Sequence, residues 1–208
     1  MMRFLLVCVL LMCAMPSTAS ITDYVVKQWN IKDGLPSQSL KSVVQDNQGY
    51  MWLGTQFGLS RFDGNTFTNY NTQNSLFLPS NGINKLLIDG QGLLWIGTKN
   101  GLVVIDPEKL TAQEFNIKGP VRDILEDSKG SIWIAANGLY YIDRGQIELR
   151  DQLNNPSPIV NATAITQIVG SVSKMALSPE GIWLVNDRNL LRLTQSASDF
   201  SKLRLELT

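Results

Sequence analysis

The sequence of 208 residues contains no histidine, and its two cysteines, Cys8 and Cys13, both lie near the N-terminus. Without histidine, this chain has no Ser-His-Asp triad, no imidazole metal ligand and no histidine phosphotransfer. Both cysteines fall inside a segment that we expect to be removed, so the mature chain is predicted to have no disulfide and no thiolate metal site. Its stability must then come from the burial of apolar surface.

An excess of charge of one sign is also missing. Lys plus Arg number 18 and Asp plus Glu number 18, so the formal net charge is zero. A nucleic-acid surface or a polybasic membrane patch would show a basic excess, and neither partner is expected. The sequence has no Walker or Rossmann glycine pattern between a strand and a helix, and no cofactor is expected.

The first nineteen residues form a separate unit. Arg3 gives a positive start, an uncharged apolar run follows over 4–15, and Ser17 and Ala19 place small residues before a cleavage site after Ala19. This is the pattern of a secretory signal peptide, and it predicts export to the periplasm. The apolar run is shorter than the roughly twenty residues that span a bilayer. An uncleaved anchor and a lipoprotein attached through Cys13 are the weaker alternatives.

The rest of the chain, 20–208, contains an internal repeat. An Asp-x-x-Gly turn, a strand with tryptophan and a Gly-Leu pair recur at 46–59, 89–102 and 127–139, with a degenerate copy at 178–191. The first two copies start 43 residues apart, and the third starts 38 residues later. A period near forty residues with tryptophan in register is typical of β-propeller blades.

Each of the first three copies divides into four short strands bounded by Gly, Asp, Asn or Pro. No apolar stripe of helical spacing is long enough for a substantial helix. The predicted fold class is therefore all-β, a β-propeller with about four blades of four antiparallel strands. The blades are predicted at 39–71, 82–117, 120–150 and 172–207, with the fourth strand of the third blade at 145–149. The segment 24–29 is predicted to be a closing strand, and 151–171 a loop insertion.

The repeated residues have structural roles. Asp-x-x-Gly fits a tight hairpin turn, in which Asp accepts backbone N–H groups and Gly adopts a positive φ. Trp52, Trp95 and Trp133 lie in the second strands, where their size suits a wedge between neighbouring blades. Gly54 and Gly97 follow two residues after a tryptophan, where a missing side chain lets a neighbour approach. The repeat predicts a core rather than a site.

The segment 29–39, WNIKDGLPSQS, leads into repeats of the form Asp-x-x-Gly-x-x-Trp-[Leu/Ile]-Gly-Thr-x-x-Gly-Leu. This combination resembles the two-component regulator propeller family, closely over 24–150 and loosely over 172–207. Ala135-Ala136 replaces the usual Gly-Thr in the third copy. The resemblance implies the periplasmic sensor region of a membrane receptor, with a histidine kinase or a GGDEF-type diguanylate cyclase as its cytoplasmic output. This chain has no Gly-Gly-Asp-Glu-Phe sequence.

Propellers of that family have more than four blades, so the resemblance also implies an incomplete arc of a larger propeller, in a fragment without membrane and output domains. Val43 and Val44 at one end, and Ile182 and Leu184 at the other, are expected on faces that lack a neighbouring blade. Exposed apolar faces predict poor solubility or self-association. A closed four-bladed ring is the alternative.

No catalytic, cofactor-binding or metal site is predicted, and the ligand-binding residues are unknown. Four aspartates stand alone in turns, unlike the closely spaced ligands of a calcium loop, and a structural role is expected for Asp33, Asp46, Asp89 and Asp127. The tryptophans fit a core better than a sugar-stacking platform. Three other aromatic residues are weak predictions for exposed ligand contacts: Phe57, Tyr70 and Phe77.

The predicted function is periplasmic ligand sensing, and the chain itself is expected not to be an enzyme. The expected partner is an unknown extracellular ligand, with an oligosaccharide as one candidate, together with the missing blades and output domain. A homodimer formed through the full-length receptor is left open. The alternatives are a freestanding periplasmic protein-binding scaffold and, with less support, a propeller-type lyase.

Overall fold

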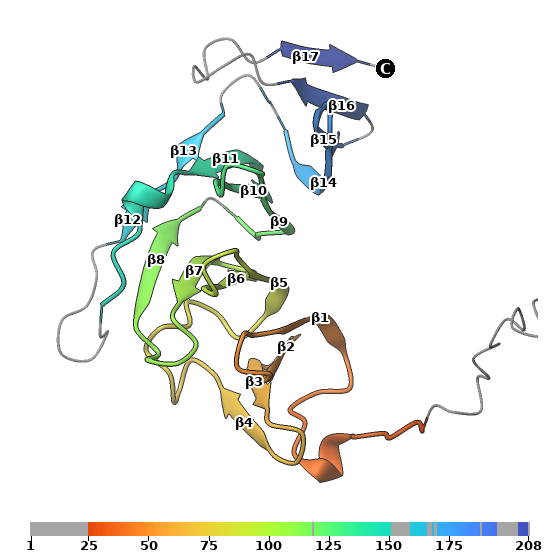
Figure 1. Ribbon diagram of the computed structural model, residues 1–208, viewed down its shortest axis with the longest axis vertical. Coiled ribbons are helices and arrows are strands. Elements are labelled where there is room, and N and C mark those ends of the chain that lie inside the picture. Colours follow the sequence, from red (N-terminus) through yellow and green to blue (C-terminus); the bar gives the residue numbers. More distant parts are fainter. Residues whose placement is uncertain are drawn as a thin grey trace, which may run out of the picture.

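The computed structural model describes residues 25–117, 119–150, 159–165, 168, 170–187, 189–194 and 204–207. The predicted signal peptide, 1–19, lies outside these residues. The described chain is all-β, with short 3-10 helices at Ile31–Asp33 (η2) and Arg144–Gln146 (η3). Its strands form four sheets that follow one another along an open arc, and the first and last sheets do not meet (Figure 1).

Each sheet is a blade, and its first strand lies on the inner edge of the arc. Blade 1 contains β1 (Leu40–Gln45), β2 (Met51–Thr55), β3 (Leu59–Phe62) and β4 (Phe67–Tyr70). Blade 2 contains β5 (Ile83–Ile88), β6 (Leu94–Thr98), β7 (Gly101–Ile105) and β8 (Ala112–Asn116), extended by β12 (Val160–Asn161). Blade 3 contains β9 (Asp123–Glu126), β10 (Ile132–Ala136), β11 (Gly138–Ile142) and β13 (Thr163–Ala164). Blade 4 contains β14 (Val172–Ser178), β15 (Gly181–Asn186), β16 (Asn189–Thr194) and β17 (Arg204–Leu207).

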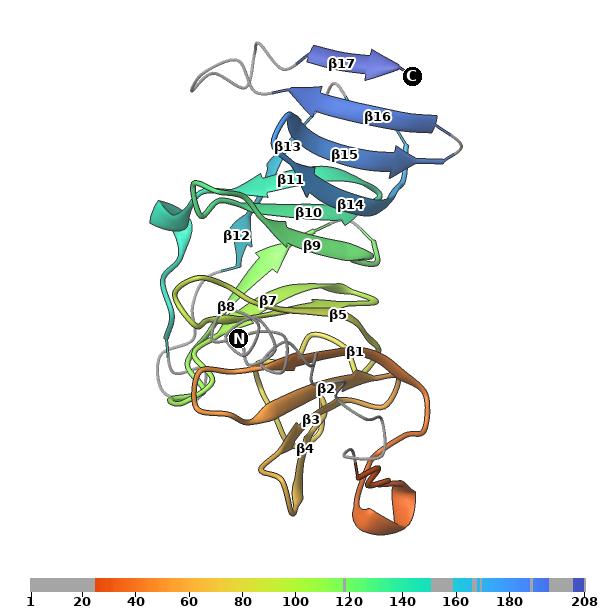
Figure 2. The ribbon, with the colours of Figure 1, turned by 45° about the vertical axis from the view of Figure 1, so that its right-hand side comes forward.

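The strands within the blades pair antiparallel, except that β12 runs parallel to β8. The inner strands β1, β5, β9 and β14 contact one another in that order along the concave side of the arc (Figures 1 and 2). Each blade therefore has two different ends. Hairpin turns join the first strand to the second at one end, and the inner strands begin at the other.

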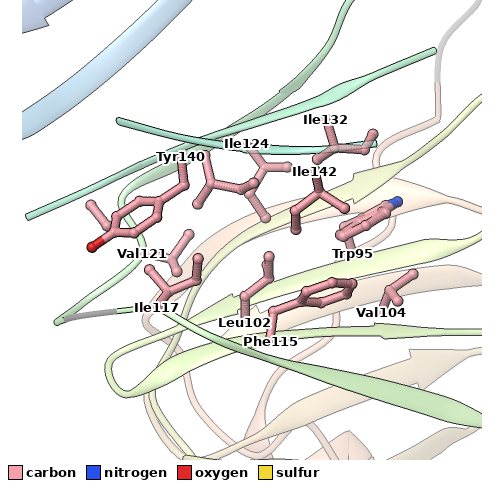
Figure 3. Close-up of a cluster of buried hydrophobic side chains, with 12 residues drawn as sticks. Trp95, Leu102, Val104, Phe115, Ile117, Val121, Ile124, Ile132, Tyr140 and Ile142 are labelled. Atoms are coloured by element: carbon pink, nitrogen blue, oxygen red, sulfur yellow. The ribbon is translucent and has the colours of Figure 1, made fainter. Parts of the chain in front are cut away.

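The hydrophobic core consists of three clusters, one between each pair of neighbouring blades. In the middle cluster Trp95 is fully buried and stacks on Phe115 with ring centroids 5.9 Å apart. Ile124 and Ile132 of blade 3 cover this pair from the other side (Figure 3). Trp52 and Trp133 are buried in the first and third clusters. The prediction that these tryptophans are wedges between blades is therefore confirmed.

The predicted role of the glycines after tryptophan is also confirmed. A Cβ atom on Gly54 would lie 2.6 Å from Ile83 Cγ2, and one on Gly97 would lie 2.5 Å from Val121 Cγ1. Ile83 begins the inner strand of blade 2, and Val121 lies just before the inner strand of blade 3. These glycines therefore set how closely successive blades approach. Blade 3 carries Ala135 at the corresponding place, and this residue is buried in the third cluster.

The predicted closing strand is wrong where the structure describes it. Residues 25–29 are not a strand, and Val25 and Val26 are 95% and 92% exposed. A strand needs a partner for its backbone groups, and no described strand pairs with this segment. Trp29 instead packs edge-on against Phe62 of blade 1, with ring centroids 5.0 Å apart.

The fourth strand of blade 3 differs from the prediction as well. Residues 145–149 begin in η3, which Asp143 caps, and Arg150 then forms an antiparallel bridge with Ala112 of blade 2. The place beside β11 is taken by β13, from the segment predicted as a loop insertion. The prediction failed because local strand propensity cannot reveal which of two segments pairs with a distant strand.

Of the four apolar residues expected on the exposed end faces of the arc, only Val43 lies on one of them. Val43 is 54% exposed on the outer face of blade 1, whereas Val44 packs against the first cluster. Ile182 and Leu184 are buried against blade 3. Side chains alternate along a strand, and Trp183 and Val185 therefore take the opposite face of β15, where both are half-buried.

Candidate functional site

At the turn end of blades 1 to 3, one arrangement is built three times. The Oδ1 atom of Asp46 accepts hydrogen bonds from the backbone N–H groups of Gln48 and Tyr50, at 2.9 and 3.0 Å. Its Oδ2 atom accepts one from Trp52 Nε1 at 2.8 Å. Asp89 and Asp127 repeat all three bonds in the next two blades. We call this arrangement the Asp–Trp clamp.

The clamp explains why Asp, Gly and Trp recur together in the sequence. Buried tryptophan needs an acceptor for its indole N–H, and the carboxylate supplies one while it closes the turn. Asp33 has a different structural role, since its Oδ2 atom accepts from the Asn30 backbone N–H and caps η2. These aspartates therefore act within the fold, as expected. Among the described residues no group of three or more Cys, Asp or Glu side chains could hold a metal ion.

One clamp carries an additional ion pair that joins two blades. Arg144 of blade 3 reaches Asp89 Oδ2 of blade 2 at 3.1 Å, and it also pairs with Glu126. The other carboxylate oxygen of Glu126 accepts from the Gly90 backbone N–H at 2.7 Å. The Asp89 side chain is fully buried, so this pair is shielded from water. Arg144, which belongs to η3, therefore links blades 2 and 3 at the turn end.

The opposite end, where the inner strands begin, is also tied from blade to blade. Lys85 Nζ lies 2.8 Å from Asp123 Oδ1, and Asp123 Oδ2 accepts from the Met175 backbone N–H at 3.0 Å. Ser42 Oγ accepts from the Leu86 backbone N–H at 2.9 Å. These contacts connect blades 1 to 2, 2 to 3 and 3 to 4, and they fix the relative positions of the inner strands.

Near these tied positions, the inner strands of blades 2, 3 and 4 each have one polar residue at an equivalent place. Asn84 lies between Ile83 and Lys85, where the register of β5 shifts, and Ser173 lies at the matching shift in β14. Arg122 precedes Asp123 in the same way. Bulges redirect side chains and are frequent beside binding sites. Three blades thus present three different polar side chains at one equivalent position.

These side chains line an open hollow of about 610 Å³, which we call the inner hollow. It brings together parts of blades 2, 3 and 4 that are up to 90 residues apart in the sequence. Its complete lining is Asn84, Lys99, Pro120, Arg122, Ser173 and Lys174.

Two of the three cations of the inner hollow are positioned by groups other than carboxylates. The stem of Lys99 lies over Gly82, where a Cβ atom would come within 2.6 Å of Lys99 Cδ. Both Nη atoms of Arg122 donate to Asn137 Oδ1 at 3.1 Å. No described carboxylate pairs with Lys99, Arg122 or Lys174.

The aromatic ligand contacts suggested by the sequence are mostly elsewhere. Phe77 is buried in the first cluster, and Tyr70 packs between Phe77 and Trp52. Phe57 is 60% exposed in the turn between β2 and β3. None of the three lines the inner hollow. Burial of Trp52, Trp95 and Trp133 likewise removes these three side chains from a sugar-stacking role.

Sequence reasoning did not find the inner hollow because its residues carry no motif. The available signal is a comparison of the repeats with one another. When the copies are aligned on the hairpin turn, the first three agree at Asp, Gly and Trp and the fourth agrees at Gly and Trp, whereas the residue five positions before the turn differs in every copy: Lys41, Asn84, Arg122 and Ser173. A position that the fold does not restrict is free to serve binding.

Comparisons with known proteins agree with this architecture. Residues 34–57, 78–100 and 117–138 match the model of the two component regulator propeller family. A segment of 52 residues is 40% identical to histidine kinase P4 of Formosa agariphila, and it covers 25% of this chain and 4% of the kinase. The family model thus matches three segments of the chain, and the chain spans a small part of the length of this relative.

Solved structures show the same fold. The extracellular domain of BT3049 from B. thetaiotaomicron, assigned to a hybrid two component system, matches 88% of this chain with a TM-score of 0.67 and 18% identity. The match covers 26% of that domain. Virginiamycin B lyase from Staphylococcus aureus matches 81% of this chain and 55% of its own, with a TM-score of 0.55 and 17% identity. Identities this low establish the propeller fold alone.

Within the part of the chain that the structure describes, no helix is both long and apolar enough to cross a membrane.

Proposed function

We propose that this chain is the ligand-sensing propeller region of an exported two-component or cyclic-di-GMP receptor, and that it binds its ligand at the inner hollow. The observation that carries the proposal is the contrast between repeated and varied positions. The clamps and wedges recur because they build the blades, while the inner hollow gathers unlike polar side chains from three of them. Rigid frames that present varied side chains are typical of binding proteins.

The comparisons support the same class. The repeats match a family named for two component regulators, and structures with the same fold include extracellular domains assigned to such systems. The signal-peptide pattern over 1–19 agrees with a location outside the cytoplasm.

A catalytic role has less support. One of the lyase structures with this fold is a histidine-to-alanine variant described as catalytically inactive, and this chain has no histidine. The lining of the inner hollow includes neither a carboxylate nor a thiol. It therefore lacks the paired acid and base that a lyase or hydrolase would need there.

Deletion of the gene in its own organism tests the proposal. Transcripts of the parent and deletion strains are compared during growth on a panel of polymeric carbon sources. A sensor predicts that the deletion strain loses induction of a defined gene set on at least one source. Unchanged transcripts on every source would contradict sensing. Loss of a degradative activity from the periplasmic extract, with transcripts unchanged, would favour the lyase.

Cell fractionation tests the export step separately. The mature chain is expected in the periplasmic fraction with Ser20 as its first residue, because cleavage is predicted after Ala19. An intact N-terminus in the membrane pellet would show that the segment acts as an anchor instead.

A further inference from the structure

We infer that the inner hollow is selective for a ligand that carries several anionic groups, either carboxylates or sulfates, on an extended polar scaffold. This inference rests on the proposed function and specifies its ligand class. The lining contains three cations, Lys99, Arg122 and Lys174, and no anion. Because the whole chain has 18 cationic and 18 anionic residues, this local excess does not follow from composition.

The nearest inner-strand carboxylate is already engaged. Asp123 pairs through Oδ1 with Lys85 and accepts the Met175 N–H through Oδ2. Its side chain is only 6% exposed. The charge of Asp123 is thus balanced by Lys85, and Asp123 forms no ion pair with the cations that line the inner hollow.

The arrangement is also partly fixed before any ligand arrives. Asn137 holds the Arg122 guanidinium through two hydrogen bonds, and Gly82 leaves room for the stem of Lys99. A guanidinium of this kind still has donors for a carboxylate or sulfate. Preorganised donors lose less conformational entropy on binding.

The neutral polar side chains of the inner hollow, Asn84 and Ser173, favour a ligand with hydroxyl groups over a free inorganic ion. Asn84, which lines the inner hollow, donates through Nδ2 to Val121 O at 2.9 Å, and its amide oxygen remains an acceptor. Ser173 adds a hydroxyl in the lining. An acceptor and a hydroxyl beside three cations suit a scaffold with its own hydroxyl groups.

The test measures binding of three probes to the purified chain by isothermal titration. The probes are tetragalacturonate, which carries four carboxylates, the uncharged galactotetraose, and inorganic phosphate. Tetragalacturonate is expected to bind at least tenfold more tightly than either of the others. Its affinity should also fall as NaCl rises from about 50 to about 500 mM, because salt screens exposed charges.

A pair of double variants assigns the binding to the inner hollow. Lys99→Gln with Lys174→Gln is expected to weaken tetragalacturonate binding by about tenfold, which corresponds to about 1.4 kcal/mol. The matched control, Lys109→Gln with Lys129→Gln, makes the same change of charge in turns at the opposite end of the blades. It should leave the affinity unchanged. Equal melting temperatures of both variants and the parent exclude a folding effect.

Each other outcome overturns the inference in a distinct way. Equal affinity for galactotetraose would show a binding site without charge selectivity, and the proposed function would stand. Phosphate binding as tight as tetragalacturonate binding would show a free-anion site rather than a site for an extended ligand. Equal weakening in the control variants would show nonspecific attraction. If no probe binds and the deletion strain also keeps its transcripts unchanged, the proposed function fails together with the inference.

Discussion

The two ends of the blades differ in how closely their residues repeat from one blade to the next. At the turn end, Asp46, Asp89 and Asp127 make the same three hydrogen bonds in successive blades. At the end where the inner strands begin, Asn84 and Arg122 occupy equivalent positions and share no chemistry. The first end is repeated because every blade needs the same turn and the same buried indole partner. The second is free to vary because none of these side chains is needed to form a blade.

The turn end of the blades and the contacts between blades therefore provide stability, and the inner hollow is left for recognition. Substitutions at the turn end or between blades should cost stability, and substitutions in the inner hollow should change binding with little effect on stability.

Replacing Trp95 with alanine tests the wedge between blades 2 and 3. Trp95 is fully buried and packs against Phe115 and blade 3, so its removal should lower the free energy of unfolding by about 3–5 kcal/mol. Urea unfolding followed by circular dichroism measures this loss. Lys99→Gln, at the other end of the same strand, should stay within about 0.5 kcal/mol of the parent. A Trp95→Ala variant as stable as the parent would show that this indole is not structural.

Replacing Asp89 with asparagine tests the clamp that also carries the ion pair. The variant loses a charged acceptor for Trp95 Nε1 and for Arg144, which should cost about 1.5–3 kcal/mol. Addition of Arg144→Met should cost less in this background than in the parent, because the guanidinium then has only Glu126 left to lose as a carboxylate partner. Urea titration of the parent, the two single variants and the double variant provides the comparison. An Arg144→Met cost as large in the Asp89→Asn background as in the parent would argue against this account.

Replacing Gly97 with alanine tests the close approach of blades 2 and 3. The added Cβ atom would lie 2.5 Å from Val121 Cγ1, so overpacking should cost about 1–3 kcal/mol. Removing the opposing methyl groups with Val121→Ala should recover part of that loss. Thermal melts of both variants give the answer. If Gly97→Ala were neutral, the spacing between these blades would be more adjustable than the packing indicates.

The smallest effect is expected at Asp63, in the exposed turn between β3 and β4. Hydrogen bonds from the backbone N–H and side chain of Thr66, and from the Asn65 N–H, lower the pKa of Asp63 from 3.8 to about 2. A carboxyl group with a lowered folded-state pKa stabilises the fold above its unfolded pKa and loses that contribution as the pH falls toward the folded value. The parent should therefore melt slightly above Asp63→Asn at pH 6, and the gap should close between about pH 4 and pH 2. A gap that is constant with pH would contradict this origin.

The repeat is what made the blades predictable from the sequence. Blades 1 and 2 are built from local hairpins, in which each strand pairs with the next one along the chain. Turn residues and alternating side chains are therefore sufficient to locate these strands. The roles of Trp95 and Gly97 followed from the same repeat, since a residue that recurs in register meets the same neighbour in each blade.

Only the tertiary structure decided the remaining features, and the reason is sequence separation. Arg144 reaches Asp89 across 55 residues, and η3, to which Arg144 belongs, lies where a fourth strand was predicted. β13 then completes blade 3 from a segment with no strand signal of its own. The inner hollow arises in the same way, because Lys99, Arg122 and Lys174 belong to three blades and meet only when the inner strands pack side by side. Local sequence patterns determined the blades of this protein, and packing between blades determined its candidate site.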